Sequence, residues 1–186
     1  MPPRKRPAAA LAESNAQPPH PASEWEPVGL SGRCPGQVRY GSDCSGLDGA
    51  ACALRRLVPD FKHLFGSEIE TNFRHVNEKN HPECEVLYRD MKKRNLDDLQ
   101  ALCESSGSGP LLYTSGFPCQ PFSCQGSQLG EKDERGQLIW DVLLTISILT
   151  PTLAILENVS ELATWQKYQK LFSEILLHLT QIGGNM

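Results

Sequence analysis

The sequence predicts an α/β fold, a doubly wound and mostly parallel sheet with helices packed against it. Apolar strand-like segments alternate with helical segments from residue 37 onward, a pattern typical of right-handed βαβ units. Glycines, acids and one cysteine follow these strands, at the edge where sheets of this type bind ligands. The chain of 186 residues, of which 39% are hydrophobic, is long enough for one domain with its own core.

The first elements alternate as this fold requires. Residues 37–46 predict a weak strand that enters a glycine turn, and residues 49–58 predict a helix with apolar side chains at helical spacing. Residues 62–68 and 85–91 predict two short strands. A helix over residues 96–105 ends before the sequence Gly-Ser-Gly-Pro, which breaks regular structure.

The remaining elements continue the alternation. Residues 110–119 predict a strand bounded by Gly-Pro and Gly-Phe-Pro, and residues 137–149 predict a long amphipathic helix that stops at Pro151. The continuous apolar run in residues 152–159 predicts a parallel strand that is buried on both faces. A last helix over residues 165–182 is closed by two glycines.

Residues 1–36 are predicted to form a disordered tail, and residues 37–186 form the domain. Eight of the 14 prolines fall in the tail, which has few large apolar residues. The basic cluster Arg4-Lys5-Arg6 could be a nuclear-import signal or a solvated charged segment, and we expect a nuclear location. The chain has no run of about 18 apolar residues, so no membrane partner is expected.

Cysteine spacing and net charge bear on the class of protein. The seven cysteines include no C-x-x-C pair, so neither a disulfide framework nor a zinc site is expected, and no metal is predicted. The spacing of Cys119 and Cys124 disfavours a thiol redox protein. A net charge of −4 does not by itself favour nucleic-acid binding, which usually requires a basic surface.

The ends of the first three strands predict a cofactor pocket. Gly46 and Gly49 lie in the first turn, where the backbone can approach a ligand closely. Glu68 and Asp90 follow the next two strands, and an acid in such a position can bind ribose hydroxyls. Neither a G-x-x-x-x-G-K-[ST] loop nor a full G-x-G-x-x-G is present. The combination favours S-adenosylmethionine, a nucleoside cofactor without a pyrophosphate.

A thiol and an acid follow the last two strands. Cys119 lies in a loop stiffened by Pro118 and Pro121, which presents the thiol and makes its thiolate a candidate nucleophile. Glu157 ends the fifth strand, where we expect a partly desolvated carboxyl that can donate a proton. A lone cysteine at a turn is more often inert, but the neighbouring acid favours catalysis.

The segments "GFPCQPFS", "DERGQLIWD" and "ENV", in this order and spacing, resemble the DNA cytosine-5 methyltransferase family. "DCSGLDGAACAL" resembles the family's first cofactor loop, and "SEIE" and "RDM" occupy the next two cofactor positions. The resemblance covers about residues 38–184 and implies the Rossmann-like fold of S-adenosylmethionine-dependent methyltransferases. It implies that the cofactor contacts Ser45, Gly46, Leu47, Glu68, Ile69, Asp90, Met91, Pro118 and Leu138.

The resemblance also implies a mechanism. Cys119 would attack carbon 6 of a cytosine flipped out of double-stranded DNA, and Glu157 would hold or protonate ring nitrogen 3. Carbon 5 would then accept the methyl group, and loss of its proton would expel the cysteine. The other implied substrate and loop residues are Gln120, Ser123, Asp133, Arg135 and Asn158; Asp133 and Arg135 would belong to a mobile loop that closes over the base.

Two departures from the family qualify this hypothesis. In the first loop, Ser42 stands where the family has an acid, Asp43 follows one residue late, and Cys44 replaces an aromatic residue. The family's Gln-x-Arg-x-Arg segment, recognition domain and final cofactor segment are not found in the sequence. We therefore expect the catalytic-motif half of a methyltransferase, with an incomplete sheet and most of the DNA-binding surface on a missing C-terminal half or a partner chain.

Three hypotheses about the function stay open at this point. The leading one is the N-terminal part of a DNA cytosine-5 methyltransferase, which could be inactive alone. The second is a short methyltransferase-like binding or regulatory protein without catalysis. The third is a transfer-RNA cytosine-5 methyltransferase, because the half that would distinguish DNA from RNA is not in the sequence.

Overall fold

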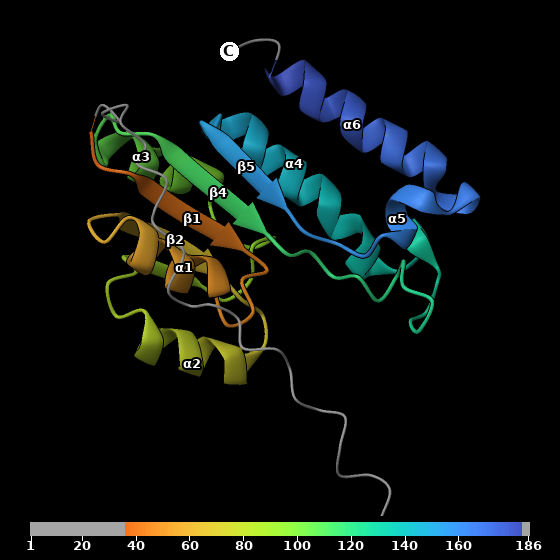
Figure 1. The fold of residues 1–186 in the computed structure, drawn as a ribbon, viewed down its shortest axis with the longest axis horizontal. Coiled ribbons are helices and arrows are strands. Elements are labelled where there is room, and N and C mark those ends of the chain that lie inside the picture. The colour runs from red at the N-terminus through yellow and green to blue at the C-terminus, as the bar shows by residue number, and fades with distance from the viewer. Residues whose placement is uncertain (1–35, 184–186) are drawn as a thin grey trace, which may run out of the picture. The chain divides into compact units, whose positions relative to one another are not determined.

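A five-stranded parallel sheet forms the centre of the structure, with the strand order β3-β2-β1-β4-β5 (Figure 1). Its strands are β1 Arg39–Asp43, β2 Lys62–Ser67, β3 Val86–Tyr88, β4 Leu111–Ser115 and β5 Leu153–Leu156. This computed structural model describes residues 36–183, so the predicted tail lies outside the described residues except for Gly36. The predicted α/β fold with a parallel, doubly wound sheet is confirmed.

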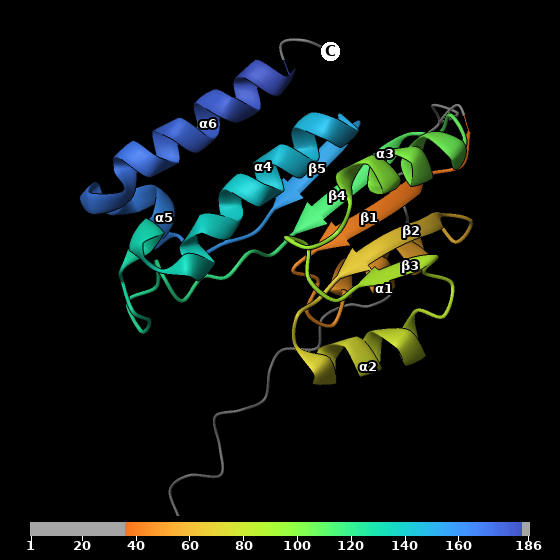
Figure 2. The same ribbon diagram turned by 180° about the vertical axis from the view of Figure 1, so that it is seen from behind.

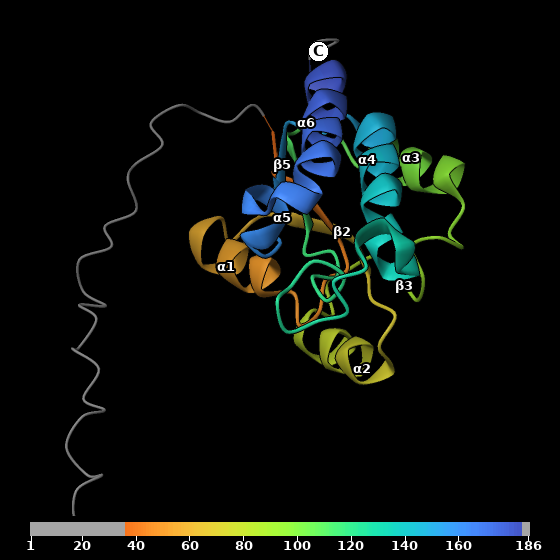
Figure 3. The same ribbon diagram turned by 90° about the vertical axis from the view of Figure 1, so that its right-hand side faces the viewer.

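Helices cover both faces of this sheet. Figures 2 and 3 show α1 and α2 on one face and α3 and α4 on the other, with α6 beside α4. The α-helices are α1 Gly49–Leu57, α2 Thr71–Asn80, α3 Leu96–Ser105, α4 Leu138–Leu149, α5 Glu161–Thr164 and α6 Gln169–Gly183. Short 3₁₀ helices occupy Gly130–Lys132, Glu134–Gln137 and Gln166–Tyr168. No helix among residues 36–183 is long and apolar enough to cross a membrane.

The larger core lies between the sheet and α4. This helix is apolar over most of its circumference, because the sheet covers one side and α6 packs against another. Its buried side chains Ile139, Val142 and Ile146 join Phe65 and Tyr113 from the central strands. A smaller core on the opposite face joins Tyr40, Ala51 and Phe61 beneath α1. The two cores fix the sheet, so the loops at its carboxyl edge are held from both sides.

Two sequence expectations about regular structure were wrong. Helix α2 was not predicted, because its sequence TNFRHVNEKN is polar and lacks an apolar face. The run 152–159 was predicted to be buried on both faces, yet Leu153 is 55% and Ile155 is 51% exposed. These two side chains lie on the face that carries α1, but β5 is the edge strand and α1 lies farther along the sheet.

Candidate active site

A cavity of about 560 Å³ opens at the carboxyl edge of the sheet. The order of the strands reverses between β1 and β4, and crevices at such a point are the usual ligand sites of parallel sheets. Among the predicted site residues it is lined by Gly46, Glu68, Ile69, Asp90, Met91, Pro118, Cys119, Gln120, Arg135, Leu138 and Glu157. Segments that lie far apart in the sequence therefore meet at one site.

The first loop is anchored by a buried ion pair. Asp43, at the end of β1, accepts hydrogen bonds from both terminal nitrogens of Arg94 at 2.5 and 2.7 Å and from the Tyr113 hydroxyl at 2.7 Å. Neither the Asp43 nor the Arg94 side chain is exposed to solvent. Arg94 also donates to Ser67 Oγ and to Thr145 Oγ1. Asp43 is thus turned into the core, where it ties β1 to the segment after β3 and to α4.

Helix α2 holds the glycine of the same loop. Its buried Asn77 donates through Nδ2 to the Gly46 carbonyl at 3.0 Å and to Ser45 Oγ at 3.3 Å. Glu68 accepts from the Gly46 amide at 2.8 Å through Oε2 and from the Glu70 amide at 2.7 Å through Oε1. Each carboxylate oxygen can accept a further hydrogen bond, so Glu68 fixes the loop and still faces the cavity.

Cys44 occupies the place of the missing aromatic residue and lines the cavity. Its φ of 50° lies in the left-handed region, which the tight turn into Gly46 requires. Burial, with the nearby charges of Asp43 and Glu68, raises the pKa of its thiol to about 12. Cys44 therefore stays a neutral thiol, and its Sγ lies 3.8 Å from the Met91 sulfur.

The Cys119 loop is a compact turn after β4. The Cys119 carbonyl accepts from the amides of Phe122 and Ser123 at 2.9 and 2.8 Å. Phe122 is completely buried and packs edge-on against Tyr168, whose hydroxyl donates to the Pro121 carbonyl at 3.0 Å. Cys119 itself is half-buried and lines the cavity. The contacts of Phe122 and Pro121 with Tyr168 hold the turn in place, while the Cys119 thiol still faces the cavity.

Glu157 follows β5 beside this turn. Its amide donates to the Ser115 carbonyl at 2.9 Å, which continues the β4–β5 pairing past the end of both strands. A Cβ built on Gly116 would lie 3.6 Å from Glu157 Oε2, so the carboxylate reaches over that glycine into the cavity. The expected partial desolvation was wrong, because Glu157 is exposed on the open edge strand.

The segment after the cysteine turn is closed by a second ion pair. Arg135 donates through Nε and a terminal nitrogen to Asp133 at 3.0 and 2.7 Å, and Ser127 Oγ donates to the same carboxylate. These bonds hold the pKa of Asp133 well below its ordinary value. A Cβ on Gly136 would lie 2.2 Å from the Gly130 carbonyl oxygen, so only glycine fits there. The Asp133–Arg135 ion pair and the close approach of Gly136 to the Gly130 carbonyl therefore hold this loop in its conformation.

Five predicted residues do not line the cavity. Ser45 and Leu47 belong to the first loop, but Ser45 Oγ bonds the Ser67 carbonyl and Leu47 is 53% exposed. Asn158 donates to the Phe117 carbonyl at 2.9 Å and so braces the two strand ends. The other two, Ser123 and Asp133, bond within the loop that follows Cys119.

Three residues with clear roles at the site were not predicted. Phe73 of α2 lines the cavity and supplies an aromatic ring that the first loop lacks. Asn77 lies one turn later on the same helix, and Arg94 follows β3. The spacing of Phe73 and Asn77 would have placed both on one helix face, but only if α2 had been predicted. No local sequence pattern identifies Arg94 as a site residue, because its partner Asp43 is 51 residues away in the sequence.

Comparison with known proteins agrees with this geometry. The family model "C-5 cytosine-specific DNA methylase" matches residues 39–185. The chain belongs to this family. Curated relatives include the type II methyltransferases M.NgoBV of Neisseria gonorrhoeae, 34% identical over 79% of this chain, and M.AluI of Cellulosimicrobium cellulans, 49% identical over 41% of it. The aligned segment spans 35% of M.NgoBV and 16% of M.AluI, so the chain corresponds to about a third or less of these relatives.

Solved structures show the same fold at low sequence identity. A protein described as a DNA modification methyltransferase encoded within an E. coli prophage aligns with a TM-score of 0.62 and 20% identity, over 78% of this chain and 38% of its own. The DNMT2 of Spodoptera frugiperda aligns with a TM-score of 0.54 and 21% identity, over 76% of this chain and 41% of its own. The predicted family and the fold are confirmed.

Proposed function

We propose that this chain carries the catalytic half of a DNA cytosine-5 methyltransferase that uses S-adenosylmethionine. The observation that supports this most is the single cavity that brings Cys119 and Glu157 together with Glu68 and Asp90. A nucleophile, a proton donor and nucleoside-binding acids are the groups that this reaction needs. The family model and the type II methyltransferase relatives support the same activity.

The residues on the cofactor side fit a nucleoside with an attached amino acid. The cavity volume of about 560 Å³ lies in the range of about 300–1,000 Å³ that is usual for such ligands. Glu68 and Asp90 offer carboxylates for ribose and amine groups, while Ile69, Phe73 and Met91 offer apolar contact for a base. When bound, S-adenosylmethionine supplies an electrophilic methyl group.

The residues on the other side would act on the flipped-out cytosine. The Cys119 thiolate forms a bond to carbon 6, and Glu157 holds or protonates nitrogen 3, so negative charge does not build up on the ring. Carbon 5 would gain electron density and take the methyl group, whose bond to the cofactor sulfur would break and leave its electron pair on that sulfur. When carbon 5 then loses its proton, the electron pair re-forms the ring double bond and expels Cys119 as thiolate.

Cofactor binding is tested by calorimetry with S-adenosylhomocysteine. Glu68→Ala should weaken binding, since it removes the proposed ribose acceptor and the bond to the Gly46 amide. Glu104→Ala, an exposed acid on α3, is the matched control. Equal affinities for Glu68→Ala and the control would refute the role of Glu68.

Catalysis is tested with the protein isolated from its own cells, whose intact mass also decides whether it is larger than 20.6 kDa. Duplex DNA that contains 5-fluorocytosine should form a covalent adduct with the wild type and with Cys124→Ser, an exposed thiol five residues away. Cys119→Ser should form none. A surviving adduct in Cys119→Ser would refute this nucleophile, and no adduct in the wild type would refute the activity.

We also propose a nuclear location, supported by the basic cluster Arg4-Lys5-Arg6 and by the DNA substrate. This cluster lies outside the described residues. A fluorescent fusion in its own cells should concentrate in the nucleus and become diffuse when the three basic residues are replaced by glutamine. A diffuse wild-type fusion would contradict the proposal.

A further inference from the structure

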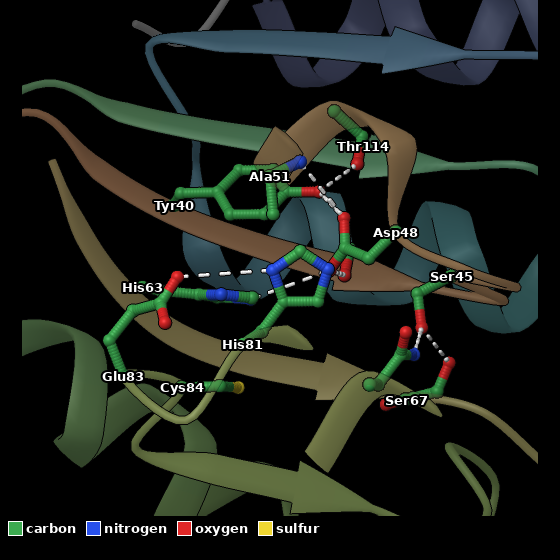
Figure 4. Close-up of polar contacts among 12 residues, drawn as sticks. Tyr40, Ser45, Asp48, Ala51, His63, Ser67, His81, Glu83, Cys84 and Thr114 are labelled. Atoms are coloured by element: carbon green, nitrogen blue, oxygen red, sulfur yellow. Dashed lines mark hydrogen bonds and ion pairs between the residues drawn. The ribbon is translucent and has the colours of Figure 1, made fainter. Parts of the chain in front are cut away.

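A second cluster of titratable side chains lies behind the first loop. His63 of β2, His81 at the end of α2 and Glu83 each place a potential ligand atom within 4.8 Å of the other two. Figure 4 shows the two imidazole rings beside Asp48, with Glu83 on the opposite side of His81. A cavity of about 220 Å³ opens beside both histidines and shares no lining residue with the cavity of Cys119.

His63 is the unusual member of this cluster. Only 1% of its side-chain surface is exposed. Within residues 36–183 neither ring nitrogen makes a hydrogen bond, and the one ion-pair contact is from Nε2 to Asp48 Oδ2 at 3.5 Å. Buried polar atoms are almost always satisfied, so a buried ring nitrogen that makes no hydrogen bond requires an explanation such as a ligand. Leaving it unpaired is costly, because burial removes the hydrogen bonds to water.

The two imidazoles are oriented as metal ligands usually are. A ligating histidine commonly points its second nitrogen at a carboxylate or a backbone carbonyl. His63 Nε2 lies 3.5 Å from Asp48 Oδ2, and His81 Nε2 lies 3.4 Å from the Leu47 carbonyl oxygen. This leaves Nδ1 of each ring as the ligand atom, and His81 Nδ1 is 3.8 Å from Glu83 Oε1.

The carboxylate behind His63 is itself rigid. Asp48 caps α1 by accepting from the Ala51 amide at 3.1 Å. It also accepts from the Tyr40 hydroxyl at 2.6 Å and from Ser42 Oγ at 3.0 Å. Because Asp48 and Leu47 both belong to the segment between β1 and α1, the histidines are supported by the back of the first loop.

We propose that His63, His81 and Glu83 bind a zinc ion. Imidazole nitrogens and a carboxylate are ordinary zinc ligands, and tetrahedral bonds of about 2.0–2.2 Å place ligand atoms about 3.4 Å apart. The three potential ligand atoms lie within 4.8 Å of one another, so zinc binding would draw the side chains closer together; that of Glu83 is 38% exposed. The cavity beside the two rings is also lined by Cys84.

A positive charge already lies where the ion would bind. The guanidinium of Arg55 donates to His81 Nδ1 at 3.1 Å, to the Asn80 carbonyl at 3.0 Å and to Glu83 Oε1. Arg55 is 44% exposed, so it can swing into solvent when a metal arrives. Arg55 therefore competes with zinc, and its removal should tighten binding. A purely structural role for the two histidines predicts no such effect.

The test is metal titration of the full chain after treatment with a chelator and a thiol reductant. Cobalt(II) should bind stoichiometrically with visible d–d absorption, and zinc should displace it. His75→Gln, an exposed histidine on α2, is the matched control and should bind like the wild type. His63→Phe, which keeps an aromatic ring beside Tyr40 and Phe61, should abolish the absorption.

Two further variants keep the proposal testable if His63→Phe fails to fold. Glu83→Gln changes only an exposed side chain and should weaken cobalt binding by about 10-fold or more, as loss of a ligand or its support does. Arg55→Gln should bind more tightly than the wild type. The proposal is overturned if the wild type shows no saturable binding, or if Glu83→Gln and Arg55→Gln both bind with wild-type affinity.

Discussion

Replacing Arg94 with methionine should lower the free energy of unfolding by about 3–5 kcal/mol, the usual cost of removing one partner of a buried ion pair. The Asp43 carboxylate is completely buried and would keep only the Tyr113 hydroxyl as a donor from another side chain. Ser67 and Thr145 would each lose a bond of 3.0 or 2.7 Å. An exposed pair is worth about 1 kcal/mol or less.

Urea denaturation followed by circular dichroism measures this loss. For a domain of about 150 residues the same loss lowers Tm by about 6–20 °C. Lys170→Met breaks the exposed pair with Glu174 on α6 and is the matched control. The double variant Asp43→Asn with Arg94→Met should recover part of the loss, since it removes the buried charge. If Arg94→Met is no less stable than Lys170→Met, the first loop is not held by this pair.

Three further predictions follow from the packing of the chain. Gly136→Ala should lower the free energy of unfolding, measured in thermal melts, by about 1–3 kcal/mol, because its Cβ would lie 2.2 Å from a backbone oxygen. Gly49→Ala, with open space around its Cβ, should raise it by about 0.4–1 kcal/mol. Burial raises the pKa of the Cys103 thiol from 9.0 to about 11, so the thiol ionises at a lower pH in the unfolded chain than in the folded one. The free energy of unfolding should therefore be highest below pH 9 and fall toward pH 11, and Cys103→Ala should reduce this pH dependence. Ile155→Lys on the open edge strand should reduce self-association measured by light scattering, whereas Leu57→Lys, at an exposed position of α1, should not. If both variants self-associate equally, the edge strand β5 is not the surface through which the chains associate.

The sequence predicted the strands because apolar runs bounded by glycine and proline are local signals. It overestimated their length at the carboxyl ends: β4 stops at Ser115, whereas the prediction continued to Cys119. There the chain leaves the sheet to form the turn that presents the thiol. Helix α2 was not predicted because the one side chain that it buries, Asn77, is polar. A helix that packs through polar contacts gives no hydrophobic period to detect.

The sequence by itself determined the family, the order of the strands along the chain and which residues follow each strand, because motifs of this kind are contiguous. Only the tertiary structure decided that Asp43 faces the core and Arg94, that Phe73 joins the cavity, and that Glu157 is exposed on an edge strand. Only the fold brings His63 to His81, across 18 positions of sequence and without a recognisable spacing. Parallel strands gather the side chains at their ends from distant segments, so contacts between those segments depend on strand order, which no local pattern records.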